Sequence, residues 1–308
     1  MSFAEEVKNE LCRYEEGNAK SEMVEISSLL RVGSSFVIGA HGSVGLRLST
    51  TNSAVARRAL ALIKKNFGVN PSVVVRKGLN LRKKNLYTLT MEPSLKTKAV
   101  LEGLRLWPMD AVIPKTWLQE WEHKRAFLRG AFLVGGSVNK PQSDYHLEFS
   151  TTNEVFAGRL MEVLKSFKLS AKLTERKDMY LIYLKSGDDV TSCLQIMGSS
   201  LAMLAFEEVR VMKEVRNQVN RKVNCETANL HKTVEAAIRQ VQAIQVIQNT
   251  IGLSSLSEKL EDAAKLRLEN PDASLQELLE IGGEAITKSG LNHRLKRLVQ
   301  IAEEMKTP

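Results

Sequence analysis

Cysteine is scarce in this chain of 308 residues, and the three that occur, Cys12, Cys193 and Cys225, lie far apart. There is no Cys-x-x-Cys pair, and the five histidines are scattered too. A disulfide framework and a zinc site are therefore not expected, and the composition fits a reducing cytoplasm. We accordingly predict no metal and no cofactor.

Long apolar runs are also missing. No run approaches the roughly 18–20 residues that a bilayer-spanning helix needs, and the acidic start Met1–Glu6 does not follow a signal-peptide pattern. We expect a cytoplasmic protein with no membrane partner.

Acidic residues are absent from the whole interval between Glu25 and Glu92, which holds eleven Lys and Arg. The net charge is +9, so residues 26–91 carry +11 and the remainder sums to −2. Charges of one sign within a segment repel one another, so a contribution to folding stability does not explain them. Solubility is the ordinary explanation, but the length of this segment favours binding to a polyanion.

A duplication organises the first two thirds of the chain. Leu30–Phe36 aligns with Phe132–Val138, and Leu46–Asn52 aligns with Leu147–Asn153, including Ser-Thr-Thr-Asn in both copies. Each copy reads as an α-β-β-α-β-β unit. The expected later elements are helices Ala54–Phe67 and Glu154–Phe167 and strands Ser72–Lys77, Leu86–Met91, Ala171–Glu175 and Tyr180–Lys185.

The first helix of each copy is apolar, and Gly130 would let the two pack closely side by side. Gly135 and Gly136 end the second of these helices, and a strand is expected to begin at Val138.

Boundaries follow from these elements. We predict a helical arm at 1–21, a first repeat at 22–104, a connector and second repeat at 105–200, a helical linker at 201–252, and a last domain at 253–308.

The connector holds Trp107, Trp117 and Trp121, which favour a hydrophobic clasp, that is, apolar packing between the two repeats, over base stacking. In the linker, Asn224–Asn229 should interrupt the helix, with Thr227 capping a new one. Its polar residues suggest either a functional cluster or a buried junction between domains.

The last domain reads as three helices. A capping box at Ser274–Glu277 opens the second, and Ser289 is expected to cap the third, whose core face is Leu291, Leu295 and Leu298. Basic and amide side chains at the exposed start of such a helix suit the major groove, where Asn reads adenine and Arg reads guanine. The predicted DNA contacts here are Lys288, Ser289, Asn292, His293, Arg294, Lys296 and Arg297.

A second set of predicted contacts lies on the strands and hairpin of the first repeat. Basic side chains at a hairpin tip suit the phosphate backbone. They are Arg47, Arg76, Lys77, Arg82, Lys83 and Lys84.

The stretch Phe127–Val138 resembles the paired-helix motif of LAGLIDADG homing endonucleases. In active members an acid stands before the last glycine and holds the metal; Gly135 occupies that position here, and Gly33 does so in the first copy. The resemblance therefore implies the fold without a catalytic site.

Three further stretches, Met1–Leu11, Asn220–Leu230 and Lys288–Leu295, resemble the WhiA family. This resemblance implies an α+β protein with a duplicated LAGLIDADG-like domain followed by an all-α helix-turn-helix domain. It also implies a non-enzymatic, nucleoid-associated regulator of sporulation, chromosome segregation or cell division genes. The implied partners are double-stranded DNA and either another regulator or RNA polymerase.

Two other functions stay open at this point. One is a working homing endonuclease or maturase, against which the two glycines argue. The other is a bridging protein whose repeat domain binds a protein, because acids such as Glu148, Glu154 and Glu162 make the second repeat far less basic.

Overall fold

Residues 1–15, 17–78, 84–283 and 287–305 are described by a computed structural model. The chain divides into two units, Met1–Lys213 and Glu214–Pro308. The first unit holds both repeats and the second is all helical, so the predicted α+β class is confirmed.

The two repeats have the same topology. The first consists of α2 (Ala19–Gly33), β1 (Ser34–Ile38), β2 (Val44–Thr50), α3 (Ser53–Phe67), β3 (Ser72–Arg76), β4 (Leu86–Met91) and α4 (Leu95–Gly103). The second consists of α5 (Trp121–Gly135), β5 (Gly136–Val138), β6 (Leu147–Thr151), α6 (Glu154–Ser166), β7 (Lys172–Arg176), β8 (Met179–Leu184) and α7 (Gly187–Met197). Their sheets are antiparallel, with orders β1-β2-β4-β3 and β5-β6-β8-β7. The predicted duplication is therefore confirmed.

The Ser-Thr-Thr-Asn sequence ends one strand and begins one helix in each copy. The side chain of Asn52 accepts from the backbone N–H of Ala54 at 2.8 Å, and Asn153 accepts from that of Phe156 at 2.8 Å. Both asparagines are N-caps, which explains why α3 and α6 begin where they do. One expected boundary was wrong, because β5 begins at Gly136, directly after α5, and not at Val138.

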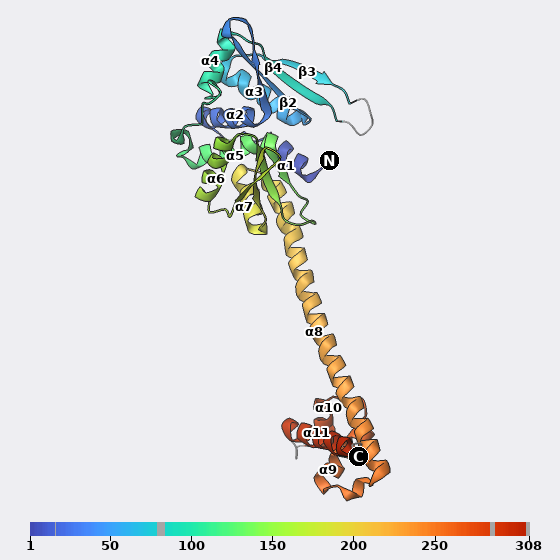
Figure 1. The fold of residues 1–308 in the computed structure, drawn as a ribbon. Helices are drawn as coiled ribbons and strands as arrows, with labels where there is room; N and C mark the ends of the chain where they lie inside the picture. Colours follow the sequence, from blue (N-terminus) through green and yellow to red (C-terminus); the bar gives the residue numbers. More distant parts are fainter. Residues whose placement is uncertain (16, 79–83, 284–286, 306–308) are drawn as a thin grey trace. The chain divides into compact units, whose positions relative to one another are not determined.

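Helices α2 and α5 lie side by side at the centre of the first unit, between the two sheets (Figure 1). A methyl group in place of the Gly130 hydrogen would lie 2.3 Å from the carbonyl oxygen of Glu25. Glycine at this position therefore permits the close approach that the sequence predicted.

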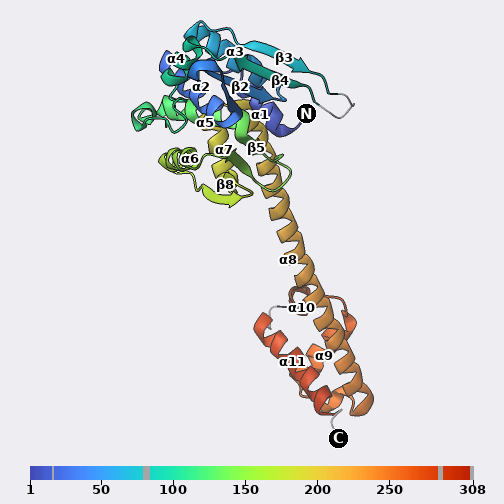
Figure 2. The same cartoon turned by 45° about the horizontal axis from the view of Figure 1, so that its top comes forward.

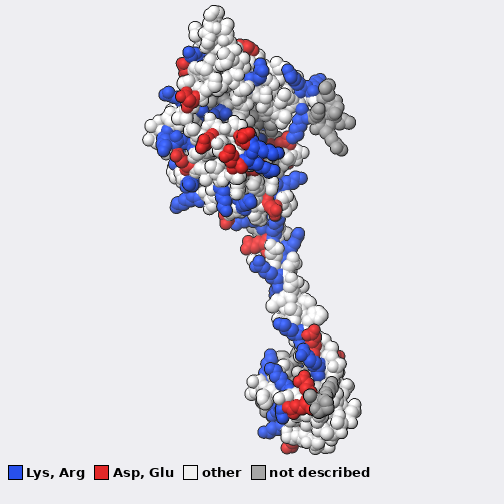
Figure 3. Space-filling view, viewed as in Figure 1, with Lys and Arg blue, Asp and Glu red and all other residues white. Residues whose placement is uncertain are grey.

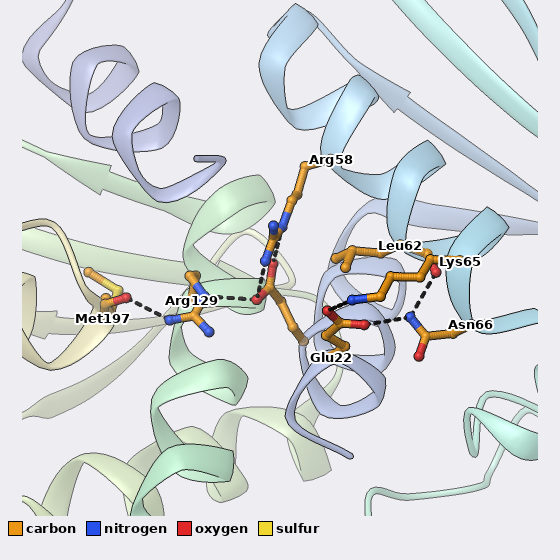
Figure 4. A network of polar contacts seen from close by, with 8 residues as sticks. Glu22, Arg58, Leu62, Lys65, Asn66, Arg129 and Met197 are labelled. Atoms are coloured by element: carbon orange, nitrogen blue, oxygen red, sulfur yellow. Dashed lines mark hydrogen bonds and ion pairs between the residues drawn. The ribbon is translucent and has the colours of Figure 1, made fainter. Parts of the chain in front are cut away.

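A buried carboxylate joins three helices across this contact (Figure 4). Glu25 of α2 is 1% exposed and accepts from Arg58 Nε of α3 at 2.9 Å and from Arg129 Nε of α5 at 2.8 Å. Arg129 also donates to the carbonyl oxygen of Met197 at 2.9 Å. One acid thus pairs with an arginine from each repeat, which ties the repeats together.

The segments around the repeats pack onto the first unit. Helix α1 (Phe3–Leu11) buries its three apolar residues, as expected of a docking arm. The 3-10 turn η1 (Ala40–Gly42) closes the β1–β2 hairpin, and η2 (Lys115–Leu118) precedes α5. The ring of Trp107 lies 5.6 Å from that of Phe36, and the ring of Trp121 lies 4.6 Å from that of Phe167. Trp107 thus packs on the first repeat and Trp121 on the second, and the clasp between the repeats stays a prediction.

Helix α8 (Ser200–Thr250) runs on without interruption, so the expected break and the Thr227 cap were wrong. No Gly or Pro stands between its ends, and some of its polar side chains bond within the helix. Thr233 donates to the carbonyl oxygen of Asn229 at 3.0 Å. Residues 214–235, which include the polar cluster at 220–229, are all exposed.

The second unit packs the end of α8 against a short helical set (Figure 2). Its elements are η3 (Leu253–Ser255), α9 (Glu258–Glu269), α10 (Leu275–Gly282) and α11 (Lys288–Glu304). Its core contains Ile244 and Ile247 of α8 and Leu278 of α10, together with the predicted apolar face of α11. No described helix has the length and apolarity of a membrane span.

Candidate nucleic-acid interface

The first sheet has one face against helices and one open, polar face. In β2, Leu46 and Leu48 are buried while Arg47 between them is exposed. The strand register places Arg47 opposite Ser35 of β1 and Thr90 of β4. Following the pleat, we assign this open face to Ser35, Val37, Gly45, Arg47, Ser49, Ser72, Val74, Arg76, Leu86, Thr88 and Thr90. Arg47 and Arg76 carry the only charges of the four strands.

Basic side chains gather where β3 and β4 approach their connecting loop (Figure 3). Arg76 and Lys77 are exposed there and form no ion pair among the described residues. Lys84 is paired with Glu5 of α1, which holds the pKa of that carboxyl down at about 2. Arg82 and Lys83 lie outside the described residues.

Other cations of the acid-free segment are bonded within the first unit. Arg31 donates to the carbonyl oxygen of Ala111 at 2.8 Å, and burial lowers its pKa to about 10. Arg58 pairs with Glu25, and Lys65 pairs with Glu22 at 2.6 Å (Figure 4). The +11 segment is thus not one continuous basic surface, since part of its charge joins the repeats to each other.

The open face of the second sheet has an acid where the first sheet has Arg47, although the register also places Lys172 and Arg176 on this face. Glu148 stands at the position of Arg47, opposite Ser137 and Tyr183 in the register. Its carboxylate lies 2.9 Å from His146 Nε2, and the rings of His146 and Tyr183 stack 5.7 Å apart. Half-buried Met179, Leu181 and Tyr183 make this face more apolar than its counterpart.

The ends of α2 and α5 are where the endonuclease motif would place its acids. A methyl group on Gly135 would lie 2.4 Å from the carbonyl oxygen of Ser150, and one on Gly33 would lie 2.6 Å from Val134. At the same place Lys8 donates to the carbonyl oxygen of Val134 at 3.4 Å. Burial lowers the pKa of Lys8 to about 8. Sequence reasoning missed Lys8, because only the docking of α1 brings it to the helix end.

Helix α11 is fixed in rotation by its core face. Leu291, Leu295 and Leu298 are fully buried, as predicted. At about 100° per residue, the opposite side carries Ser289, His293 and Lys296. The expected cap was wrong, since Thr287 accepts from Gly290 N–H at 3.2 Å and Ser289 lies inside the helix.

The remaining predicted contacts of α11 divide between its exposed side and its flanks. Asn292 and Arg294 are half-buried and lie on opposite flanks of the core face. Arg297 is exposed, with a loose ion pair to Glu304 at 3.4 Å, and Lys288 is exposed at the first helical position. The fold thus brings these side chains together at one helix, while the sheet residues belong to the other unit.

The family comparisons match nearly the whole chain. Three family models match in succession, described as the WhiA N-terminal LAGLIDADG-like domain (residues 19–107), the WhiA LAGLIDADG-like domain (124–216) and the WhiA C-terminal HTH domain (219–302). The "Probable cell division protein WhiA" of Clostridium botulinum is 40% identical over 99% of both chains. That of Clostridium tetani is 38% identical over 99% of this chain and 98% of the relative.

Solved structures agree with these matches. The structure described as full-length DUF199/WhiA from Thermatoga maritima has a TM-score of 0.63 and 28% identity, covering 99% of both chains. The N-terminal LAGLIDADG domain of DUF199/WhiA has a TM-score of 0.53 and 26% identity, covering 64% of this chain and 90% of that one.

Proposed function

The chain belongs to the WhiA family, and we propose that it is a sequence-specific DNA-binding transcriptional regulator without nuclease activity. Its expected targets are genes of bacterial cell division, chromosome segregation or sporulation, and its expected location is the cytoplasm, at the nucleoid. The observation that carries the proposal is α11, whose buried leucines fix an exposed face of His293, Lys296 and Arg297. A fixed helix with exposed basic side chains suits readout of base edges.

The first sheet would supply a second DNA contact. Its open face offers Arg47 and Arg76 among hydroxyl side chains, with Lys77 beside them. Arginine, serine and threonine side chains are common donors to phosphate oxygens. This face would therefore add affinity that does not depend on sequence.

Two features support the absence of cleavage. Gly33 and Gly135 have no side-chain oxygen, and backbone or side-chain atoms crowd the space where one would stand. The ammonium group of Lys8 lies at the same helix end, where a divalent cation would be repelled.

The second candidate function is a bridge between DNA and another regulator or RNA polymerase. It is favoured by the second sheet, whose open face has Glu148 opposite Tyr183 together with half-buried Leu181 and Met179. A half-apolar face with an acid suits a protein partner better than a phosphate backbone.

The experiment that tests the main proposal is selection of bound duplexes from a random-sequence pool by the full-length protein. We expect enrichment of one sequence pattern, and the loss of that pattern with His293→Ala/Arg297→Ala but not with the exposed control Lys259→Ala of α9. If the double variant His293→Ala/Arg297→Ala enriches the same pattern as Lys259→Ala does, α11 does not recognise the bases. No enrichment at all would contradict sequence-specific binding.

A further inference from the structure

A cavity of about 330 Å³ lies within the second unit, where α8, α9, α10 and the start of α11 meet. Its lining includes Lys232 and Gln240 of α8, Arg267 of α9, Leu275 and Gln276 of α10, and Lys288 of α11. Three of these side chains are cationic and no lining residue is acidic. We call this cavity the α10 pocket.

Two buried polar groups of the pocket have unfilled bonding positions. Arg267 is 2% exposed, and its Nη1 donates to the carbonyl oxygens of Ala273 at 2.6 Å and Asn270 at 3.3 Å. Its Nε has no partner among the described residues, and neither has Oε1 of Gln240, which is 7% exposed. Buried donors and acceptors are nearly always paired, so these two atoms leave polarity unsatisfied in the wall of the pocket.

The beginning of α10 adds backbone donors. Its capping box occupies the N–H of Ser274, which donates to Glu277 Oε2 at 2.7 Å, and the N–H of Glu277, which donates to Ser274 Oγ at 3.3 Å. The N–H groups of Leu275 and Gln276 lie between these two and have no partner within the helix. Both residues line the pocket, at the positive end of the helix dipole.

We propose that the α10 pocket binds a phosphoryl group. Its donors come from the side chains of Lys232, Arg267 and Lys288 and from the start of α10, so they converge from four helices. A carboxylate has two oxygens to offer such a set, whereas a phosphoryl group has three.

Two sources share this chemistry, namely the DNA backbone and a small phosphorylated compound. Lys288 is the first residue of α11, so an occupant of the pocket touches the start of the proposed reading helix. The inference goes beyond the proposed function, because phosphate binding is measurable without DNA.

The test is equilibrium dialysis of the full-length protein against radiolabelled inorganic phosphate in a phosphate-free buffer. We expect saturable binding of one phosphate per chain. Lys232→Gln removes an exposed cation and Gln240→Glu adds a repelling charge without a change in size, so each should weaken binding about tenfold or more. The matched control is Lys222→Gln, an exposed lysine on the same helix away from the pocket, which should bind as the unchanged protein does.

A second arm adds a saturating DNA duplex and separates the two sources. Displacement of phosphate by the duplex, with weaker DNA binding by Lys232→Gln, assigns the pocket to the DNA backbone. Simultaneous binding of phosphate and duplex assigns it to a small phosphorylated compound. Absence of saturable binding up to about 10 mM phosphate, or an equal loss with Lys222→Gln, would overturn the proposal. Either result leaves sequence selection by the protein unaffected, so the proposed function stands or falls separately.

Discussion

Arg47 and Glu148 occupy equivalent positions in the two sheets and carry opposite charges. Each lies in the second strand of its repeat, two residues before the serine of Ser-Thr-Thr-Asn, with its side chain on the open face. The backbone is thus duplicated while the surface is not. The pair offers a symmetry-matched test of which sheet contacts DNA.

For this pair we expect Arg47→Ala to reduce the slope of log K against log salt by about one on any duplex, because one phosphate contact is lost. Arg76→Ala should do the same. Glu148→Ala should leave the slope unchanged, as should Lys64→Ala, which lies on the helical side of the first repeat. Fluorescence anisotropy at several salt concentrations measures these slopes. An unchanged slope for Arg47→Ala would mean that the first sheet faces away from DNA.

Glu25, which holds two arginines, should be far more important for stability than Glu22, whose cationic partner Lys65 is exposed. We expect Glu25→Ala to lower the free energy of unfolding by about 3–5 kcal/mol, because the buried charge of Arg129 and the half-buried charge of Arg58 would lose their carboxylate partner. Glu22→Ala should cost about 1 kcal/mol or less, since its partner Lys65 is exposed. All three tryptophans lie in the first unit, so urea unfolding followed by tryptophan fluorescence reports on it. If both variants lose the same free energy of unfolding, Glu25 does not tie the repeats together.

Lys8 should make stability depend on pH in the alkaline range. Burial lowers its pKa from 10.5 to about 8 in the folded protein. Between these values the unfolded chain binds more protons, so the free energy of unfolding should rise with pH from about 8 to 10.5.

Lys8→Met should abolish that rise and raise stability at pH 7 by about 1–3 kcal/mol. The exposed control Lys20→Met should change neither quantity. The same fluorescence assay at pH 7 and pH 10 decides the point, and an unchanged pH dependence in Lys8→Met would contradict the prediction.

Sequence discrimination should reside in the exposed and flanking side chains of α11. We expect Asn292→Ala to cost roughly 1–3 kcal/mol on the best site and much less on random DNA. Lys288→Ala should weaken both about equally, as a phosphate contact does. Paired titrations on the specific and the random duplex, with folding checked by circular dichroism, give the ratio of the two affinities for each variant. If Asn292→Ala, His293→Ala and Arg297→Ala all leave the ratio unchanged, the selection must come from the repeat domain.

Metal-dependent cleavage is not expected with magnesium or manganese, even on the protein's own selected DNA. Gly135→Asp should not create it, because the new side chain would collide with the Ser150 carbonyl oxygen and lower stability instead. The measurement is nicking of supercoiled and linear DNA that carries the site. Specific nicking that persists through repurification would contradict both this prediction and the non-enzymatic reading.

The sequence by itself determined the elements, the duplication and the core face of α11. These features depend on local patterns, namely strand alternation, asparagine caps and leucine spacing, and each was found within one or a few residues. Local patterns also misled in two places. Thr227 looked like a cap but lies within α8, and Ser289 looked like a cap where Thr287 serves, because several hydroxyl residues near a helix start satisfy the same pattern.

Only the tertiary structure decided which charges are paired. Lys65 and Arg58 belong to the acid-free segment, yet they pair with Glu22 and Glu25, which lie 43 and 33 residues earlier in the chain. The close packing of α2 against α5 likewise places Glu25 beside Arg129, across 104 residues of sequence. The energy of an ion pair depends on distance and burial in space, and neither quantity is carried by the order of residues along the chain.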